Sequence, residues 1–113
     1  MDKDLGKTST GIQPNVAALL SYVAGFVTGI IFFLIEKENK FVRFHALQSA
    51  ITFGVIFVLQ MVLMYLPYIA VFLVPILSIG SLIIWIICMV KAYQGEMFKL
   101  PVIGDIAEKQ IKA

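Results

Sequence analysis

The chain has 113 residues, of which 60% are hydrophobic and 14% are charged, and its formal net charge is +2. Soluble domains are about 45–50% apolar and about 25% charged, and a chain this short can bury only a limited part of its surface. The composition therefore excludes a typical soluble enzyme and favours a small protein that is surrounded by lipid.

Charged residues are concentrated in three segments, 1–7, 36–43 and 91–112, and long uncharged stretches lie between them. The first uncharged stretch, 16–35, would measure about 30 Å as a helix, which matches the hydrocarbon thickness of a bilayer. It is longer than the apolar part of a signal peptide, and charged residues follow it instead of a cleavage site. This stretch predicts a first transmembrane helix, preceded by a flexible N-terminal tail over residues 1–14.

The second uncharged stretch runs from Phe44 to Val90 and is long enough for two spans. A Tyr-Leu-Pro-Tyr sequence at 65–68 divides it, because proline disfavours helix in the residue before it and tyrosines suit the headgroup boundary. The predicted spans are about 44–66 and 68–90. The predicted fold is an all-α integral membrane protein with three transmembrane helices in a small bundle (15–94) and a short interfacial, cytoplasmic C-terminal segment (95–113).

Lysine and arginine residues set the predicted orientation. Three spans would place the N-terminus and the turn at 65–68 on one side, with only Lys3 and Lys7. The other side would carry Lys37, Lys40, Arg43, Lys91, Lys99, Lys109 and Lys112. Because cytoplasmic loops are enriched in positive charge, we expect a multi-pass protein of the cell membrane with the N-terminus outside and the C-terminus in the cytoplasm. The predicted interface anchors are Arg43, Tyr65, Tyr68 and Lys91.

Small residues recur at four-residue spacing in the first predicted span, at Ser21, Gly25 and Gly29. Without bulky side chains two helices can approach closely, which is how membrane helices gain packing energy. The pattern predicts a helix-packing face. Its partner is the second helix, the third helix or another subunit.

Polar side chains follow one face at the start of the second predicted span, at His45, Gln48, Ser49 and Thr52, with Gln60 about two turns deeper. Polar groups are costly in hydrocarbon, so this polar stripe must face protein, water or a ligand. It either forms hydrogen bonds with neighbouring helices or lines a cytoplasmic vestibule in which His45 responds to protons. Gln60, near mid-depth, needs a partner.

Catalytic and metal-binding patterns are missing from the sequence. One histidine, one cysteine and no intramembrane carboxylate make no metal cluster, and His45 with Ser49 is the one conceivable base and nucleophile. We expect no enzymatic activity, no cofactor and no metal. The expected partners are the lipid bilayer and either further copies of the chain or other membrane proteins, with no nucleic acid.

Two segments resemble a known family. Residues 35–49, in which charged residues lead into Phe-Val-Arg-Phe-His-Ala, resemble the signature of a family of small bacterial and archaeal membrane proteins whose function is not established. Residues 91–105, with Gly and then Pro-Val-Ile-Gly, resemble the same family's C-terminal motif. The family is grouped with the inner-envelope subunit of the chloroplast protein-import translocon, whose members have four spans where this chain offers three. The resemblance implies a helical membrane protein that belongs to a channel or an assembly complex.

These observations together predict a non-enzymatic membrane protein that acts by helix–helix association in an oligomer or a membrane complex. The alternative is a subunit of a pore or protein-translocation channel, in which the polar stripe would line a water-filled cavity.

Overall fold

The computed structural model describes residues 5–112, without the side chain of Lys112. Lys3 and that side chain, which enter the predicted orientation, therefore lie outside the described residues. The described chain is all-helical, as the sequence predicts, and residues between the helices form turns and extended segments. The helices are α1 (Pro14–Val23), α2 (Phe26–Ile35), α3 (Lys40–Leu63), α4 (Pro67–Tyr93) and α5 (Ile103–Lys112).

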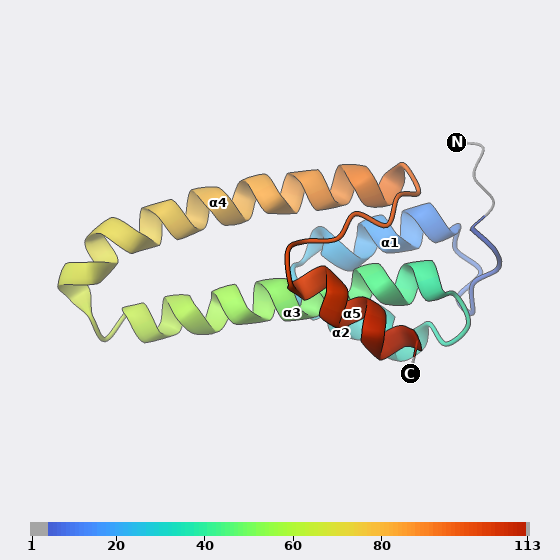
Figure 1. Ribbon diagram of the computed structural model, residues 1–113, viewed down its shortest axis with the longest axis horizontal. Helices are drawn as coiled ribbons and strands as arrows, with labels where there is room; N and C mark the ends of the chain where they lie inside the picture. The colour runs from blue at the N-terminus through green and yellow to red at the C-terminus, as the bar shows by residue number, and fades with distance from the viewer. Residues whose placement is uncertain (1–4, 113) are drawn as a thin grey trace.

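Helices α3 and α4 form a long antiparallel hairpin (Figure 1). At about 1.5 Å per residue, their 24 and 27 residues extend for about 36 and 40 Å. Both are long and apolar enough to cross a bilayer. Pro67 begins α4, where the missing N–H removes no helical hydrogen bond. Tyr65 and Tyr68 flank the turn and are 85% and 89% exposed.

The stretch 16–35 is not the single helix that the sequence predicts. It forms α1 and α2, two ten-residue helices that turn back on each other at Ala24 and Gly25. Each extends for about 15 Å, half of the hydrocarbon thickness. Gly25 has φ +62°, a conformation open to glycine but rare for other residues. Uncharged length alone does not reveal such a turn, so the prediction of a first span over 16–35 is wrong.

The turn between α1 and α2 is closed by local hydrogen bonds. The Gly25 N–H donates to the Tyr22 carbonyl at 3.0 Å. The Thr28 hydroxyl accepts from the Ala24 N–H and donates to the Ser21 carbonyl, both at 3.1 Å. A hydroxyl inside the hairpin thus satisfies backbone groups that the break in the helix releases.

The half-length hairpin brings the N-terminal segment (residues 5–13) to the same end as the loop between α2 and α3 (residues 36–39). The Ser9 N–H donates to the Glu36 carboxylate at 2.8 Å, and the Ser9 hydroxyl accepts from the N–H groups of Lys37 and Glu38. The Asn39 amide donates to the carbonyls of Leu5 and Lys7. The predicted placement of these two segments on opposite sides is therefore corrected, because it depended on the single first span.

Helix α2 packs closely on α3 at Gly29. A Cβ atom on this glycine would lie 2.8 Å from both the Ala46 carbonyl oxygen and the Ala50 nitrogen. Such an approach is available to a residue without a side chain and follows the small-residue packing of membrane helices. The turn at Gly25 divides the predicted face, with Ser21 in α1 and Gly29 in α2, and α3 is the element that Gly25 and Gly29 approach.

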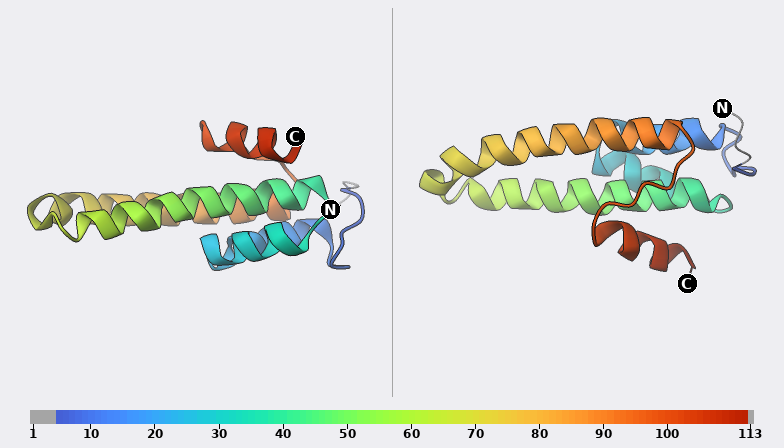
Figure 2. Two further views of the ribbon diagram at one scale, coloured as in Figure 1. Left: turned by 90° about the horizontal axis from the view of Figure 1, so that it is seen from below. Right: turned by 45° about the horizontal axis from the view of Figure 1, so that its top comes forward.

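The C-terminal strap (residues 94–102) leaves α4 and runs back along α3, and α5 follows it. Figure 2 shows that the α1–α2 hairpin and α5 lie on opposite sides of α3. The buried core therefore lies in the half of the molecule that holds these segments. The far half of the α3–α4 hairpin exposes large apolar side chains, including Val58, Met64, Val71, Phe72 and Ile76.

Replacing Gly29 with alanine tests the close approach of α2 to α3. The new methyl group would contact α3 backbone atoms that cannot rotate away, so we expect a loss of about 1–3 kcal/mol of unfolding free energy. Gly80→Ala is the control, because a Cβ there meets no atom within 4 Å. It should be neutral or stabilise by up to about 1 kcal/mol. Denaturant titration in detergent micelles measures both, and equal stabilities would contradict this packing.

Candidate functional site

The polar stripe of α3 lies in the core, between the α1–α2 hairpin and the C-terminal strap. His45, Gln48 and Ser49 are fully buried and Thr52 is 3% exposed. Gln60 lies farther along the helix and is half-buried. The structure thus brings the first four predicted residues together and leaves Gln60 apart from them.

His45 joins α1 to the C-terminal strap. Its Nε2 lies 2.8 Å from the Glu96 carbonyl oxygen, which only accepts, so Nε2 carries the ring proton. Nδ1 then accepts from the Tyr22 hydroxyl at 2.7 Å. The rings of Tyr22, Phe41 and Phe44 surround the imidazole edge-on. Both ring nitrogens are therefore engaged with protein, and the aromatic rings exclude other partners.

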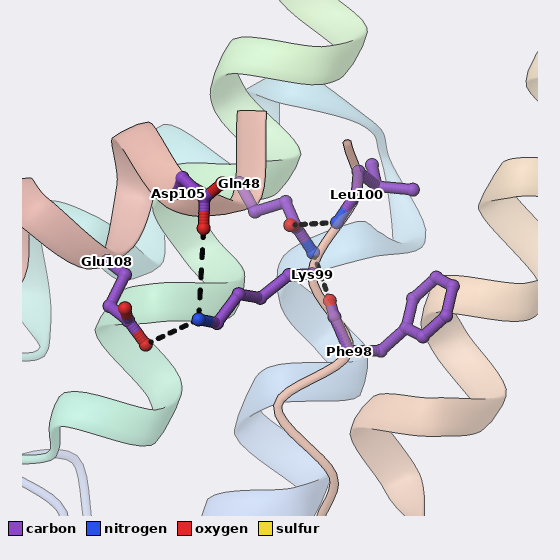
Figure 3. A network of polar contacts seen from close by, with 6 residues as sticks. All are labelled: Gln48, Phe98, Lys99, Leu100, Asp105 and Glu108. Atoms are coloured by element: carbon purple, nitrogen blue, oxygen red, sulfur yellow. Dashed lines mark hydrogen bonds and ion pairs between the residues drawn. The ribbon is translucent and has the colours of Figure 1, made fainter. Parts of the chain in front are cut away.

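Gln48 binds the strap as a neighbouring β-strand would. Its Nε2 donates to the Phe98 carbonyl at 2.8 Å and its Oε1 accepts from the Leu100 N–H at 2.9 Å (Figure 3). The second Nε2 hydrogen goes to the Tyr22 hydroxyl at 2.9 Å. One side-chain amide thus satisfies two backbone groups of an extended segment that has no strand beside it.

The hairpin turn is held by two further side chains. The Ser49 hydroxyl donates to the Gly25 carbonyl at 3.0 Å. The indole Nε1 of Trp85, on α4, donates to the Tyr22 carbonyl. No local sequence signal connects Trp85 with the hairpin, because their contact joins residues 63 positions apart.

Arg43 caps α2, a role that its position in the sequence did not indicate. Its guanidinium donates to the carbonyls of Phe33 at 3.0 Å and Glu36 at 2.7 Å, and lies 4.2 Å from the centre of the Phe33 ring. A cation at the C-terminal end of a helix is stabilised by the partial negative charge there. Of the other predicted anchors, Lys91 forms an ion pair with Glu96 at 3.2 Å.

A further set of charges ties the strap to α5. The Lys99 ammonium lies 3.0 Å from the Glu108 carboxylate and 3.8 Å from that of Asp105 (Figure 3). Because Lys99 immediately precedes Leu100, these ion pairs and the amide of Gln48 hold the same part of the strap.

Glu36 is fully buried in the loop that joins α2 to α3. Burial alone would raise the pKa of its carboxyl, but hydrogen bonds from the N–H groups of Ser9, Asn39 and Glu38 outweigh it and lower the pKa below the ordinary value. The ionised carboxylate therefore stabilises the contact between the N-terminal segment and this loop.

A groove of about 480 Å³ lies where the α1–α2 hairpin ends between α3 and α4. Gln60 lies in it, and its side-chain amide forms no hydrogen bond within the described chain. The lining combines small, aromatic and polar residues: Gly25, Phe53, Phe57, Gln60, Ser78 and Trp85.

Acid–base and metal chemistry find little support in this geometry. Ser49 donates to a backbone carbonyl, whereas both nitrogens of His45 bind other groups, so the two do not form a base–nucleophile pair. Residues 5–112 contain no group of three or more His, Cys, Asp or Glu side chains placed to hold a metal ion. What the arrangement does provide is a set of donors and acceptors that fix irregular backbone.

Replacing Gln48 with leucine tests the strap attachment. The Phe98 carbonyl and the Leu100 N–H would lose their partners, at a cost of about 1–3 kcal/mol for each group left unsatisfied. We expect trypsin to cleave after Lys99 faster than in the wild type. Gln94→Leu makes the same exchange at an exposed position and should leave the rate unchanged. Equal cleavage of the two variants would contradict the role of Gln48.

Acidification tests the role of Glu36. Because folding lowers its pKa, its contribution to stability is present above the ordinary glutamate value of 4.5 and is lost as the pH falls through the lower, folded value. We expect the Ser9 N–H to lose protection against hydrogen exchange in that acidic range. Glu36→Gln should lack this transition, and Glu38→Gln, at an exposed side chain, should keep it. A wild-type transition that persists in Glu36→Gln would exclude this carboxylate as its source.

Comparison with known proteins gives the family. A family model described as the magnetosome magnetite crystal formation protein family matches residues 9–107. A UPF0132 membrane protein of Methanocaldococcus jannaschii is 51% identical over 105 residues, which cover 93% of this chain and 94% of the relative. A UPF0132 membrane protein of Archaeoglobus fulgidus is 54% identical over 100 residues, or 88% and 97% of the two chains. No solved structure matches.

These findings confirm the predicted resemblance to small archaeal membrane proteins, but nothing in them links the chain to the chloroplast translocon subunit. The family match covers both segments that carry the resemblance. The chain is similar to the archaeal UPF0132 membrane proteins, and it belongs to the magnetosome magnetite crystal formation protein family.

Proposed function

We propose that the protein is a non-enzymatic subunit of a membrane assembly, and that it acts by helix–helix association at the groove beyond the α1–α2 hairpin. The observation that carries the proposal is Gln60. Its amide lies in the groove between the two long apolar helices and has no hydrogen-bond partner within residues 5–112.

The distribution of charge supports a topology with two crossings. All the segments with described lysine and arginine residues lie at one end of the molecule: the N-terminal segment, the loop at 36–39, the first turn of α3, the end of α4, the strap and α5 (Figure 1). The turn between α3 and α4 carries none. By the positive-inside rule the charged end is cytoplasmic, so the N-terminal segment (residues 5–13) and α5 lie on the cytoplasmic side, and the α1–α2 hairpin enters the membrane from there.

Gln60 supports a second copy of this chain as the partner. A side-chain amide has both donors and an acceptor, so two copies related by a two-fold axis can pair amide to amide. Ala24, Gly25, Ser78 and Ser81 line the same groove and leave space for a close approach. Such pairing gives the Gln60 amide of each copy a hydrogen-bond partner, so that no unsatisfied amide faces the hydrocarbon.

The alternative, a subunit of a pore or translocation channel, receives less support. It requires His45, Gln48 and Ser49 to line a water-filled path, whereas these side chains are buried and bound to protein. The family's description concerns magnetite, but the described residues offer no cluster of metal-binding side chains to extend that role to this chain. Helix–helix association therefore agrees better than a pore with the burial of the polar stripe and with the groove at Gln60.

Gln60→Leu tests the proposal because leucine keeps the volume and removes the amide. Interhelical hydrogen bonds in membranes contribute about 0.6–2 kcal/mol, so the dissociation constant of a dimer should rise roughly 3- to 30-fold. Energy transfer between labelled copies, measured in vesicles as the lipid-to-protein ratio is raised, gives this constant. Ser78→Ile, which fills the groove, should weaken association further.

Met61→Leu provides the matched control, since Met61 is adjacent to Gln60 but exposed outside the groove. It should leave association unchanged. Wild-type association in both Gln60→Leu and Ser78→Ile would overturn the proposal. If a cysteine at Thr52, in a Cys88→Ser background, reacted with a membrane-impermeant thiol reagent, a water-filled path would be favoured instead.

A further inference from the structure

A second cavity, of about 380 Å³, lies on the strap side of the α3–α4 hairpin. The C-terminal strap forms one wall of this strap cavity, and the two long helices and the first residue of α5 form the others. Its lining is almost entirely aliphatic, and no charged side chain contributes to it. The principal lining residues are Thr52, Ile56, Ile76, Gly80, Leu100 and Ile103.

Thr52 is the one polar residue in this lining that lacks a partner. Its hydroxyl is the sole buried side-chain N or O atom in the described chain without a hydrogen bond, and the residue is 3% exposed. A helical threonine can donate to the carbonyl four residues earlier, here that of Gln48, but Thr52 does not. Ser81, across the cavity, already donates to the Leu77 carbonyl. The hydroxyl of Thr52 is therefore the unpaired polar group of this lining.

The strap cavity has room for a hydrocarbon group. Its volume is more than twice that of the roughly 150 Å³ engineered cavity that takes up benzene. Gly80 opens onto this space, since a Cβ built on it meets no atom within 4 Å. An aliphatic lining with a single unpaired hydroxyl selects a neutral apolar chain that carries one hydrogen-bonding oxygen.

The position of the strap cavity further restricts the class of ligand that it can bind. Leu100, in its wall, follows Lys99, whose ammonium pairs with Asp105 and Glu108 of α5. On the other side of Thr52 the lining continues to Val55 and Ile76, on the exposed apolar surface of the long hairpin. The cavity thus joins a charged region to hydrocarbon, as the glycerol backbone of a lipid joins its headgroup to its chains.

We propose that the strap cavity binds one chain of a membrane lipid, and that an ester or ether oxygen at the start of that chain accepts a hydrogen bond from the Thr52 hydroxyl. The C-terminal strap, held by Gln48, forms the wall that closes over the chain. The site lies on the strap side of the α3–α4 hairpin, shares Ile56 and Ser81 with the groove that contains Gln60, and does not depend on self-association.

Thr52→Val tests the proposed hydrogen bond, because it should raise stability without lipid and reduce the stabilisation that added lipid provides. Valine keeps the shape and removes the hydroxyl. In lipid-free detergent the variant should unfold at a higher temperature than the wild type, because it loses an unsatisfied buried group. Added dioleoyl phosphatidylcholine should then stabilise the wild type more than the variant. The lost hydrogen bond should weaken lipid binding roughly 2- to 10-fold, as measured by lipid titration with native mass spectrometry.

Two further variants complete the test. Gly80→Leu fills the cavity and should abolish the single tightly bound lipid, whereas Ile79→Leu, at the adjacent exposed position, should retain it. If Gly80→Leu bound lipid with wild-type stoichiometry and affinity, the lipid would lie elsewhere and the proposal would be overturned. Equal lipid stabilisation of the wild type and Thr52→Val would exclude the proposed hydrogen bond.

Discussion

Backbone that leaves the helical conformation beside a membrane helix needs partners for its N–H and C=O groups, because surrounding lipid offers none. In the described chain, the Ala24–Gly25 turn and the C-terminal strap are two such segments that lie against α3. The polar stripe of α3 supplies the partners for both. Ser49 binds the turn, and His45 and Gln48 bind the strap, while the Tyr22 hydroxyl links these last two side chains. The stripe therefore serves as the fixed support on which the two irregular segments are held.

The same interactions explain why the family resemblance involves two segments far apart in sequence. The first segment contains His45 and Gln48, and the second contains the carbonyls of Glu96 and Phe98 and the N–H of Leu100, to which they bind. The two motifs are thus the two halves of one contact. The apolar walls of the strap cavity and the unpaired hydroxyl of Thr52 lie one turn beyond it.

The α1–α2 hairpin is only half as long as a membrane span, so it leaves part of the surface of α3 and α4 uncovered. Beyond its tip no helix of residues 5–112 covers the long hairpin of α3 and α4, and the Gln60 amide in the resulting groove has no hydrogen-bond partner among these residues. A third full span would have covered this region within one chain. The half of the molecule that holds the hairpin, the strap and α5 is thus packed by the chain itself, and the opposite half exposes large apolar side chains.

The sequence by itself determined the helical class, the lipid surroundings and the long hairpin, because uncharged length and the Tyr-Leu-Pro-Tyr sequence are local signals. It also identified His45, Gln48 and Ser49 as side chains that need partners. Tertiary structure decided three further features. These are the break at Gly25, the position of the N-terminal segment at the same end as the 36–39 loop, and the cap that Arg43 forms on α2. Glycine in a membrane span is compatible with both packing and a turn. What selects the turn at Gly25 is its support by Ser49 and Trp85, which lie 24 and more residues away.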